Sequence, residues 1–383
     1  MQIDFSDEQR IFRKTIRDFA EKEVAPLVDD AEKNEKFPRE LLPKLGELGY
    51  LGVVYPIEYG GAGAGKVEEC IFVEELGRVC VGITGGIMIQ SGMATSSIFD
   101  YGSDYLKQEY LVPAIKGNKI AAFAISEPNA GSDVASIECK AVEDGDSYVI
   151  GGNKTYISNG PIADFVLTAA YTDKSKGSNG GISLFVVDTK LPGFSARKMH
   201  KFCLRSSETG ELHYDNVRVP KENLVGEVGY GFKYLMESLT GGRIIHAARS
   251  LGLASAAYDA SLEYAQVRQQ FGRPIGKFQA VAFKLARMAT ELHVGRLLVY
   301  DTARLHDQGK RCIKEAAMAK LFTSESAQSI TREAMHIHGG FAFFDESPIQ
   351  RYFRDASLGT TVEGTSEVQQ MIISKEIGVG SSI

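Results

Sequence analysis

The chain of 383 residues contains no tryptophan, only seven histidines and only five cysteines. The cysteines, at positions 70, 80, 139, 203 and 312, are scattered and odd in number, which favours reduced thiols of a cytoplasmic protein over a disulfide framework. No HxxxH or CxxC pair is present, so we expect no metal site. No segment reaches about 18 consecutive apolar residues, the length that a membrane span requires, so none is expected.

Basic residues are fewer than acidic residues. The 43 lysines and arginines against 49 aspartates and glutamates give a formal net charge of −6, which argues against a nucleic-acid partner. The first ten residues contain no basic stretch followed by an apolar run, so we expect no signal peptide. The remaining composition, with 44% hydrophobic residues, suits a globular protein of two or three domains.

The character of the sequence changes twice along the chain. Residues 1–118 are predicted to be helical, because Ser6 and Gln9 have the spacing of a capping box and apolar residues then recur near the helical period. Residues 119–226 contain β-branched and aromatic runs between turn residues, which predict strands. Residues 227–383 return to helical periodicity. We therefore predict an α+β protein with an N-terminal helical domain, a central β domain and a C-terminal helical domain.

Local signals refine this organisation. The Gly-Gly-Asn at 151–153 predicts a turn between two short strands, 148–150 and 155–157. Gly272 and Pro274 are expected to mark the end of a helix. No GxGxxG lies between a strand and a helix, so a Rossmann unit is not predicted.

Near the C-terminus, Glu363 stands directly before a turn of small residues, 364–366, that leads into an apolar-periodic segment. A carboxylate on such a turn can point into a cleft and act as a base against a weakly acidic carbon. A simpler interpretation is that Glu363 only stabilises the dipole of the helix that follows. The spacing alone favours the simpler interpretation.

Two central segments carry polar groups next to strands. Residues 123–133 lead from an apolar strand into a turn with the hydroxyls of Ser126 and Ser132, which suit a polar ring edge or phosphate, or else a solvated loop. Residues 154–160 include Tyr156, an aromatic that either stacks on a ligand or covers a β-surface.

Two C-terminal segments suit a diphosphate. The guanidinium of Arg268 has the geometry to grip one, although it also suits the end of a helix. The pair Gly339–Gly340 lets backbone amides approach phosphates closely.

These segments, in this order, resemble the motifs of the acyl-CoA dehydrogenases, and the resemblance extends over the whole chain: SEPNAGSD at 126–133, KTYISNG at 154–160, RQQFGRPI at 268–275, HIHGG at 336–340 and EGTSEVQ at 363–369. It implies an N-terminal helical domain, a central β domain and a C-terminal four-helix bundle, with FAD between the β domain and the bundle and completed by a neighbouring subunit. It also implies a homotetramer, an acyl-CoA substrate and an electron-transfer flavoprotein as electron acceptor.

The same resemblance implies roles for single residues. Glu363 would remove the α-proton of the thioester, and Gly242 stands where some members carry that Glu, so Glu363 is the single candidate base. The implied cofactor-binding residues are Phe123, Ile125, Ser126, Ser132, Tyr156, Ser158, Arg268, Phe271, Gln279, His336, Gly339, Gly340, Thr365 and Glu367. The implied substrate-binding residues are Ile89, Met93, Ser132, Arg243, Val362 and Gly364.

Substrate choice depends on positions where the sequence departs from the family. Residues 87–94 are expected to line an apolar acyl pocket. Thr84 stands where glutaryl-type members have an Arg, which argues against a dicarboxylyl substrate. Val362 replaces a frequent Tyr, so either a branched or cyclic acyl group gains room or neighbouring side chains fill the gap. Tyr156 replaces a common Trp and His336 a common Gln.

Two other functions on the same scaffold remain open at the level of sequence. One is an acyl-CoA oxidase that passes electrons to O2. The other is a non-catalytic scaffold that binds FAD, which the presence of Glu363 and the negative net charge argue against.

Overall fold

The computed structural model describes residues 5–380, and its N-terminal segment is helical as predicted. Ser6 and Gln9 form the expected capping box, with the Gln9 amide donating to Ser6 Oγ over 3.2 Å. The α-helices of this segment are α1 (Asp7–Phe19), α2 (Val28–Lys33), α3 (Leu41–Glu47), α4 (Lys66–Val79), α5 (Val81–Met88), α6 (Ser96–Tyr101), α7 (Asp104–Leu106) and α8 (Val112–Ile115). The π-helical turns are η1 (Ala20–Val24), η5 (Ile89–Met93) and η6 (Lys107–Leu111).

The central segment forms an eight-stranded sheet with the order β6-β7-β3-β2-β4-β5-β8, in which β1 pairs in parallel with β4. The strands are β1 (Ala121–Ala124), β2 (Lys140–Asp144), β3 (Ser147–Ser158), β4 (Phe165–Tyr171), β5 (Ile182–Asp188), β6 (Phe194–Met199), β7 (Thr209–Pro220) and β8 (Leu224–Val225), and the short helix α9 (Ser178–Gly181) precedes β5. Strands β4 and β5 coincide with β-branched and aromatic runs of the sequence, and both are almost entirely buried.

The predicted turn at 151–153 is wrong, because β3 continues through it as a single strand. Both halves of β3 pair with the same long partner, β7. The glycines produce a bulge instead of a turn. The register shifts between Ile150 and Gly152, and Gly152 adopts a φ of 144° where a side chain would lie 2.9 Å from Cys139 Cα.

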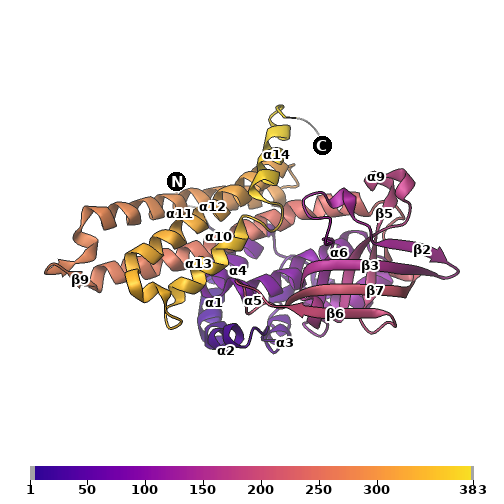
Figure 1. Ribbon diagram of the computed structural model, residues 1–383, viewed down its shortest axis with the longest axis horizontal. Coiled ribbons are helices and arrows are strands. Elements are labelled where there is room, and N and C mark those ends of the chain that lie inside the picture. The colour runs from indigo at the N-terminus through magenta and orange to yellow at the C-terminus, as the bar shows by residue number, and fades with distance from the viewer. Residues whose placement is uncertain (1–4, 381–383) are drawn as a thin grey trace.

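The C-terminal segment is built from α10 (Gly231–Val267), α11 (Gln279–Asp307), α12 (Ile313–His338), α13 (Pro348–Gly359) and α14 (Ser366–Glu376). Helix α10 starts against the sheet and runs to the far end of the molecule (Figure 1). It ends at Val267, earlier than Gly272 and Pro274 suggested, because residues 269–274 form a hairpin of β9 (Gln269–Gln270) and β10 (Arg273–Pro274). Phe271 and Gly272 take positive φ values in its turn.

The two helical segments share one hydrophobic core. Helix α4 packs along α10, and buried residues from residue 5 to residue 356 belong to the same cluster. A second cluster joins helices α6 and α8 to one face of the sheet, and a third fills its other face. The predicted α+β fold is confirmed. Among residues 5–380, no helix is both long and apolar enough to cross a membrane.

Candidate active site

The turn before α14 holds Glu363 in a strained conformation. Glu363 has a φ of 58° and Gly364 a φ of 88°, so two consecutive residues lie in the left-handed region. The side-chain amide of Gln369 donates to both of their carbonyls at 2.9 Å, and Lys320 Nζ donates to the Gly364 carbonyl at 2.7 Å. The helix begins after Thr365, whose hydroxyl accepts from Val368 N. Glu363 therefore lies outside the helix.

Glu363 is half-buried, and its carboxylate lies near three cations. Its Oε2 is buried without a hydrogen-bond partner in the described chain, and a Cβ at Gly242 on α10 would lie 3.0 Å from it. Burial raises the pKa of Glu363, and the nearby charges of Arg243, Arg249 and Lys320 partly oppose that rise. Such a carboxylate is a stronger base than an exposed one. Only glycine at position 242 leaves it this room.

Five of the predicted substrate-binding residues belong to α10, to η5 or to the turn that carries Glu363. Arg243 is buried on α10, next to Gly242, and its Nε has no hydrogen-bond partner in the described chain. Ile89 and Met93 are half-buried at the two ends of η5, and Val362 and Gly364 flank the base in the chain. A side chain at Gly364 would meet Gln369 Nε2 at 2.7 Å, so this position also requires glycine. Ser132 lies apart on the exposed turn of the β domain.

The structure brings Ser126 and Tyr156 together. The Thr155 amide donates to the Ser126 carbonyl over 3.0 Å. Lys154 is fully buried and bonds both the Ile125 carbonyl, at 2.9 Å, and the Glu127 carboxylate, at 2.8 Å. This buried ion pair clamps the turn to β3.

A second bulge in β3 presents the Tyr156 ring. The register of β3 against β7 shifts between Lys154 and Ile157, and Tyr156 takes a φ of 60° with 67% of its surface exposed. Three other predicted cofactor residues from the same two sequence segments are half-buried: Phe123, Ser126 and Ser158. An exposed ring beside hydroxyls suits a flat, polar ring system.

The predicted cofactor residues of the β9–β10 hairpin and of the end of α12 lie at the other end of the molecule. Arg268 and Phe271 belong to the β9–β10 hairpin, and His336, Gly339 and Gly340 follow the end of α12. The His338 ring stacks on Tyr264 of α10 with centroids 4.4 Å apart, which joins these two segments. Figure 1 shows the hairpin at the opposite end of the long axis from the sheet. One subunit therefore does not bring the two halves of the predicted cofactor site together.

The chemistry of both halves fits a flavin dinucleotide. At Gly339, with a φ of 63°, and at Gly340, an added Cβ would meet nothing within 4 Å, so the backbone is open to a ligand. Arg268 and Gln279 are exposed beside them. Thr365 and Glu367 lie at the first turn of α14, with Glu367 exposed.

Three family descriptions match the chain in order along its length. The acyl-CoA dehydrogenase N-terminal domain matches residues 6–118, the middle domain residues 122–217 and the C-terminal domain residues 229–378. The chain belongs to the acyl-CoA dehydrogenase family. It is an oxidoreductase of a family of flavoproteins, as its sequence motifs predicted.

Individual members of the acyl-CoA dehydrogenase family are similar over nearly the whole chain. A 3-(aryl)acrylate reductase of Clostridium sporogenes is 42% identical over 375 residues, 97% of this chain and 99% of that protein. The caffeyl-CoA reductase-Etf complex subunit CarC of Acetobacterium woodii is 41% identical over 372 residues, with 97% and 98% covered. The structure of butyryl-CoA dehydrogenase from Megasphaera elsdenii matches with a TM-score of 0.95 at 37% identity, covering 98% of this chain and 100% of that chain.

Sequence reasoning missed several groups that shape this acyl-CoA dehydrogenase site. Lys320 and Gln369 hold the turn, but nothing local in their sequence distinguishes them from ordinary helix residues. His246 and Arg249 on α10 could have been found from their spacing in the sequence. They follow Gly242 at helical spacings of four and seven, so they share its face.

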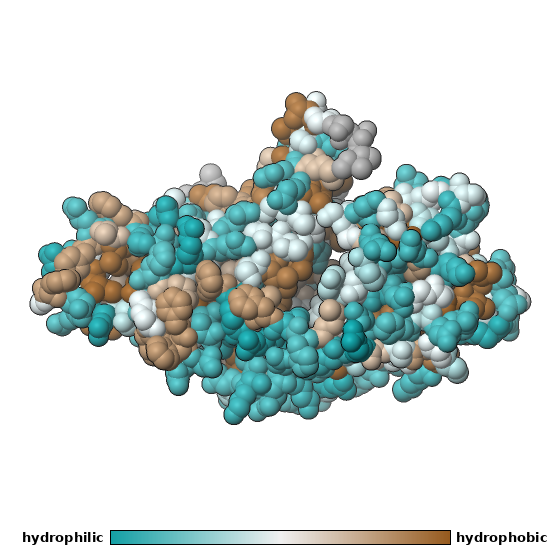
Figure 2. All heavy atoms as spheres, in the orientation of Figure 1, coloured by the Kyte–Doolittle hydropathy of each residue, from teal (hydrophilic) through white to brown (hydrophobic). Residues whose placement is uncertain are grey.

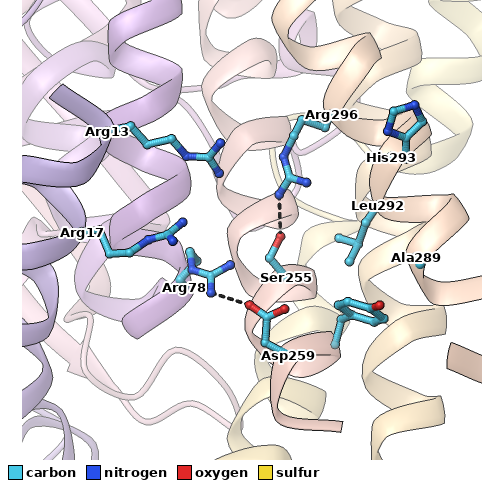
Figure 3. A pocket seen from close by; sticks show the side chains of 10 residues that line it. Arg13, Arg17, Arg78, Ser255, Asp259, Ala289, Leu292, His293 and Arg296 are labelled. Carbon is cyan, nitrogen blue, oxygen red and sulfur yellow. Dashed lines mark hydrogen bonds and ion pairs between the residues drawn. The ribbon is translucent and has the colours of Figure 1, made fainter. Parts of the chain in front are cut away.

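A separate open cavity of about 360 Å³ lies between α1, α4, α10 and α11, and contains no residue of the Glu363 site (Figure 3). Four arginines line it, and each already has an acidic partner. Arg13 and Arg17 pair with Glu75, Arg78 with Asp259 and Arg296 with Glu74. The cavity is therefore a paired charge network, and we assign it no part in the chemistry.

Proposed function

We propose that this chain catalyses the FAD-dependent α,β-dehydrogenation of an acyl-CoA thioester, with Glu363 as the base. One observation carries the proposal. Oε2 of the half-buried Glu363 is enclosed without a hydrogen-bond partner in the described chain, and it faces a glycine that leaves room beside it. A carboxyl group with a raised pKa, held on a strained turn, is typical of a catalytic base.

In this reaction the Glu363 carboxylate takes one proton from Cα of the thioester. A hydride leaves Cβ and a Cα=Cβ double bond forms, so the substrate loses two electrons and two hydrogens. FAD, when bound, supplies the acceptor of that hydride. The Glu363 backbone N–H is available to donate to the thioester carbonyl, which makes Cα more acidic. Substrate that expels water from the site raises the basicity of the carboxylate further.

The proposed FAD site is shared between two subunits. Ser126, Tyr156 and Ser158 would hold the ring system, while Arg268 and the Gly339–Gly340 turn of a neighbouring copy would hold the diphosphate. The end that carries β9 also exposes large apolar side chains, as Figure 2 shows. These are Val267, Phe271, Phe341, Phe343 and Phe344, exposed by between 50% and 93%. Apolar exposure on this scale fits burial against another copy, and we propose a homotetramer.

An electron-transfer flavoprotein is the proposed electron partner, since a relative at 41% identity is named as a subunit of a reductase–Etf complex. The names of two relatives also favour a second candidate, the reverse reaction, in which a 2-enoyl thioester is reduced. That direction uses the same groups, with Glu363 as the acid that returns the proton to Cα.

The test consists of two anaerobic experiments. In the first, the purified, yellow protein is mixed with acyl-CoA, and in the second, the reduced protein is mixed with 2-enoyl-CoA. The proposal predicts that acyl-CoA bleaches the oxidised flavin and that 2-enoyl-CoA reoxidises the reduced flavin. Reoxidation of the reduced flavin by O2 is expected to be slow. Mass spectrometry of the released cofactor is expected to show FAD. A protein that holds FMN, or whose flavin no acyl-CoA bleaches, would contradict the proposal, and fast reoxidation in air would favour an oxidase.

A further inference from the structure

Arg249 on α10 is a buried cation that forms no ion pair with a carboxylate of residues 5–380. Only 8% of its surface is exposed, and its one hydrogen bond in the described chain runs from Nη2 to His246 Nδ1 over 3.0 Å. A guanidinium carries five N–H donors, so most of these lack a protein acceptor. Arginine is rarely buried without a paired charge, which makes the missing acceptor significant.

The guanidinium lies between α10 and α5, the helix that leads into the segment predicted to line the acyl pocket, residues 87–94. Gly242, His246 and Arg249 occupy one face of α10, and Gly242 is the residue against which the Glu363 carboxylate lies. At the other end of this face, Arg249 Nη1 is 3.0 Å from the position of a Cβ at Gly85 on α5. Arg249 follows Gly242 by about 10 Å along the helix axis, and helix side chains lean back toward the N-terminus. The cation is therefore a few carbon–carbon bonds beyond the reacting atoms.

His246 fixes the orientation of Arg249 without neutralising it. Its Nε2 lies 3.1 Å from the Gly359 carbonyl, to which it must donate, so Nδ1 is left to accept from Arg249. Burial and the charge of Arg249 hold the pKa of His246 well below its usual value, which agrees with a neutral ring. The pair thus aims one positive charge toward α5.

Positive charge exceeds negative charge around the base. Arg243, Arg249 and Lys320 all act on Glu363, which is the largest favourable charge for each of them. Asp355 on α13 also faces Arg249, but its Oδ1 accepts from the Leu204 amide at 2.7 Å and forms no ion pair with the arginine. A neutral acyl chain would leave the Arg249 charge in a dry pocket with no new counter-ion.

We propose that Arg249 binds a second carboxylate at the far end of the acyl group, so that the substrates are monothioesters of short dicarboxylic acids. This inference depends on the proposed acyl-CoA chemistry at Glu363. It revises the expectation drawn from Thr84. In glutaryl-type members the arginine stands at the position of Thr84, on α5. Here the cation for the distal carboxylate comes from α10 instead, and it reaches Gly85, the residue after Thr84.

The test compares thioesters matched in length, glutaryl-CoA with pentanoyl-CoA and adipyl-CoA with hexanoyl-CoA, in anaerobic flavin bleaching by the native protein. The dicarboxylyl member of a pair is expected to have a kcat/KM higher by about 10²-fold, because removing one partner of a buried charge pair commonly weakens binding by about 30-fold to several thousand-fold. Arg249→Gln is expected to abolish this ratio, chiefly through KM, while Arg249→Lys keeps part of it. Arg332→Gln, an exposed arginine on α12, is the control and leaves the ratio unchanged.

A second variant keeps the charge and changes only its position. In Gly85→Ala the new methyl group would meet the Arg249 guanidinium, so the dicarboxylyl preference is expected to fall while pentanoyl-CoA is turned over as before. Dissociation constants measured in the Glu363→Gln background, where turnover is blocked, should follow the same order. This binding measurement is independent of the chemical step.

The inference is overturned if the native protein prefers the neutral thioesters, or prefers ω-hydroxyacyl-CoA to the dicarboxylyl member. It is also overturned if Arg249→Gln lowers only the unfolding temperature and leaves the ratio intact, since the arginine is then structural. In these cases acyl-CoA still bleaches the flavin, and the proposed function stands. If no thioester of either class bleaches it, the proposed function itself fails.

Discussion

Replacing Gly242 by alanine separates the placement of the base from the stability of the helix. A Cβ at this position would lie 3.0 Å from Glu363 Oε2 and 3.7 Å from its Cδ. An ordinary contact is restored when the carboxylate moves by about 0.4 Å. Because a 1 Å misplacement of a reacting group can reduce a rate by about 10²-fold, a shift of this size corresponds to roughly sixfold. The same methyl group should stabilise α10 by about 0.5–1 kcal/mol, since glycine is a poor helix former.

The adjacent glycine offers a matched control. A Cβ at Gly241 would meet nothing closer than Lys66 Nζ, at 3.4 Å, which is an ordinary contact. Gly241→Ala therefore gains the helix propensity without touching the base. The two variants are compared by the anaerobic rate of flavin reduction and by the midpoint of thermal unfolding. We expect both midpoints to rise and only Gly242→Ala to slow reduction. Equal rates in the two variants would show that the Glu363 carboxylate does not lie against Gly242.

Three further changes test the surroundings of the site. Lys320→Gln removes a charge that lowers the pKa of Glu363. Because the base is active only when deprotonated, the acidic limb of the kcat profile should move to higher pH. Lys314→Gln, at the start of α12 where the lysine pairs with Glu315, should leave that limb in place. Arg268→Ala should both weaken FAD retention and loosen the oligomer on dilution, since a ligand that spans two subunits stabilises their association. A monomeric holoprotein with full flavin occupancy in light scattering would contradict the shared site. Glu127→Gln leaves Lys154 buried and unpaired, so it should lower the free energy of unfolding, measured by denaturant titration, by about 3–5 kcal/mol. A change under about 1 kcal/mol would show that the clamp is dispensable.

The order of helical, β and helical segments was predictable because apolar periodicity and β-branched runs are local properties of the sequence. The strained turn at Glu363 was also marked locally, by the small residues that follow it. The continuity of β3 was not, because Gly151–Gly152 suits both a turn and a bulge, and only the long partner strand β7 decides between them. The orientation of Arg249 depends on where α5 and α13 pack against α10, which no single segment specifies.

The central claim is that Glu363 removes the α-proton, and the most direct test is Glu363→Gln. The side chain keeps its shape, so FAD content, thermal stability and acyl-CoA binding should remain close to those of the native protein. The decisive measurement is the anaerobic rate of flavin bleaching by the best substrate of the native protein. Loss of the base is expected to slow it by about 10²–10⁴-fold or more. Near-native bleaching by Glu363→Gln would contradict the assignment.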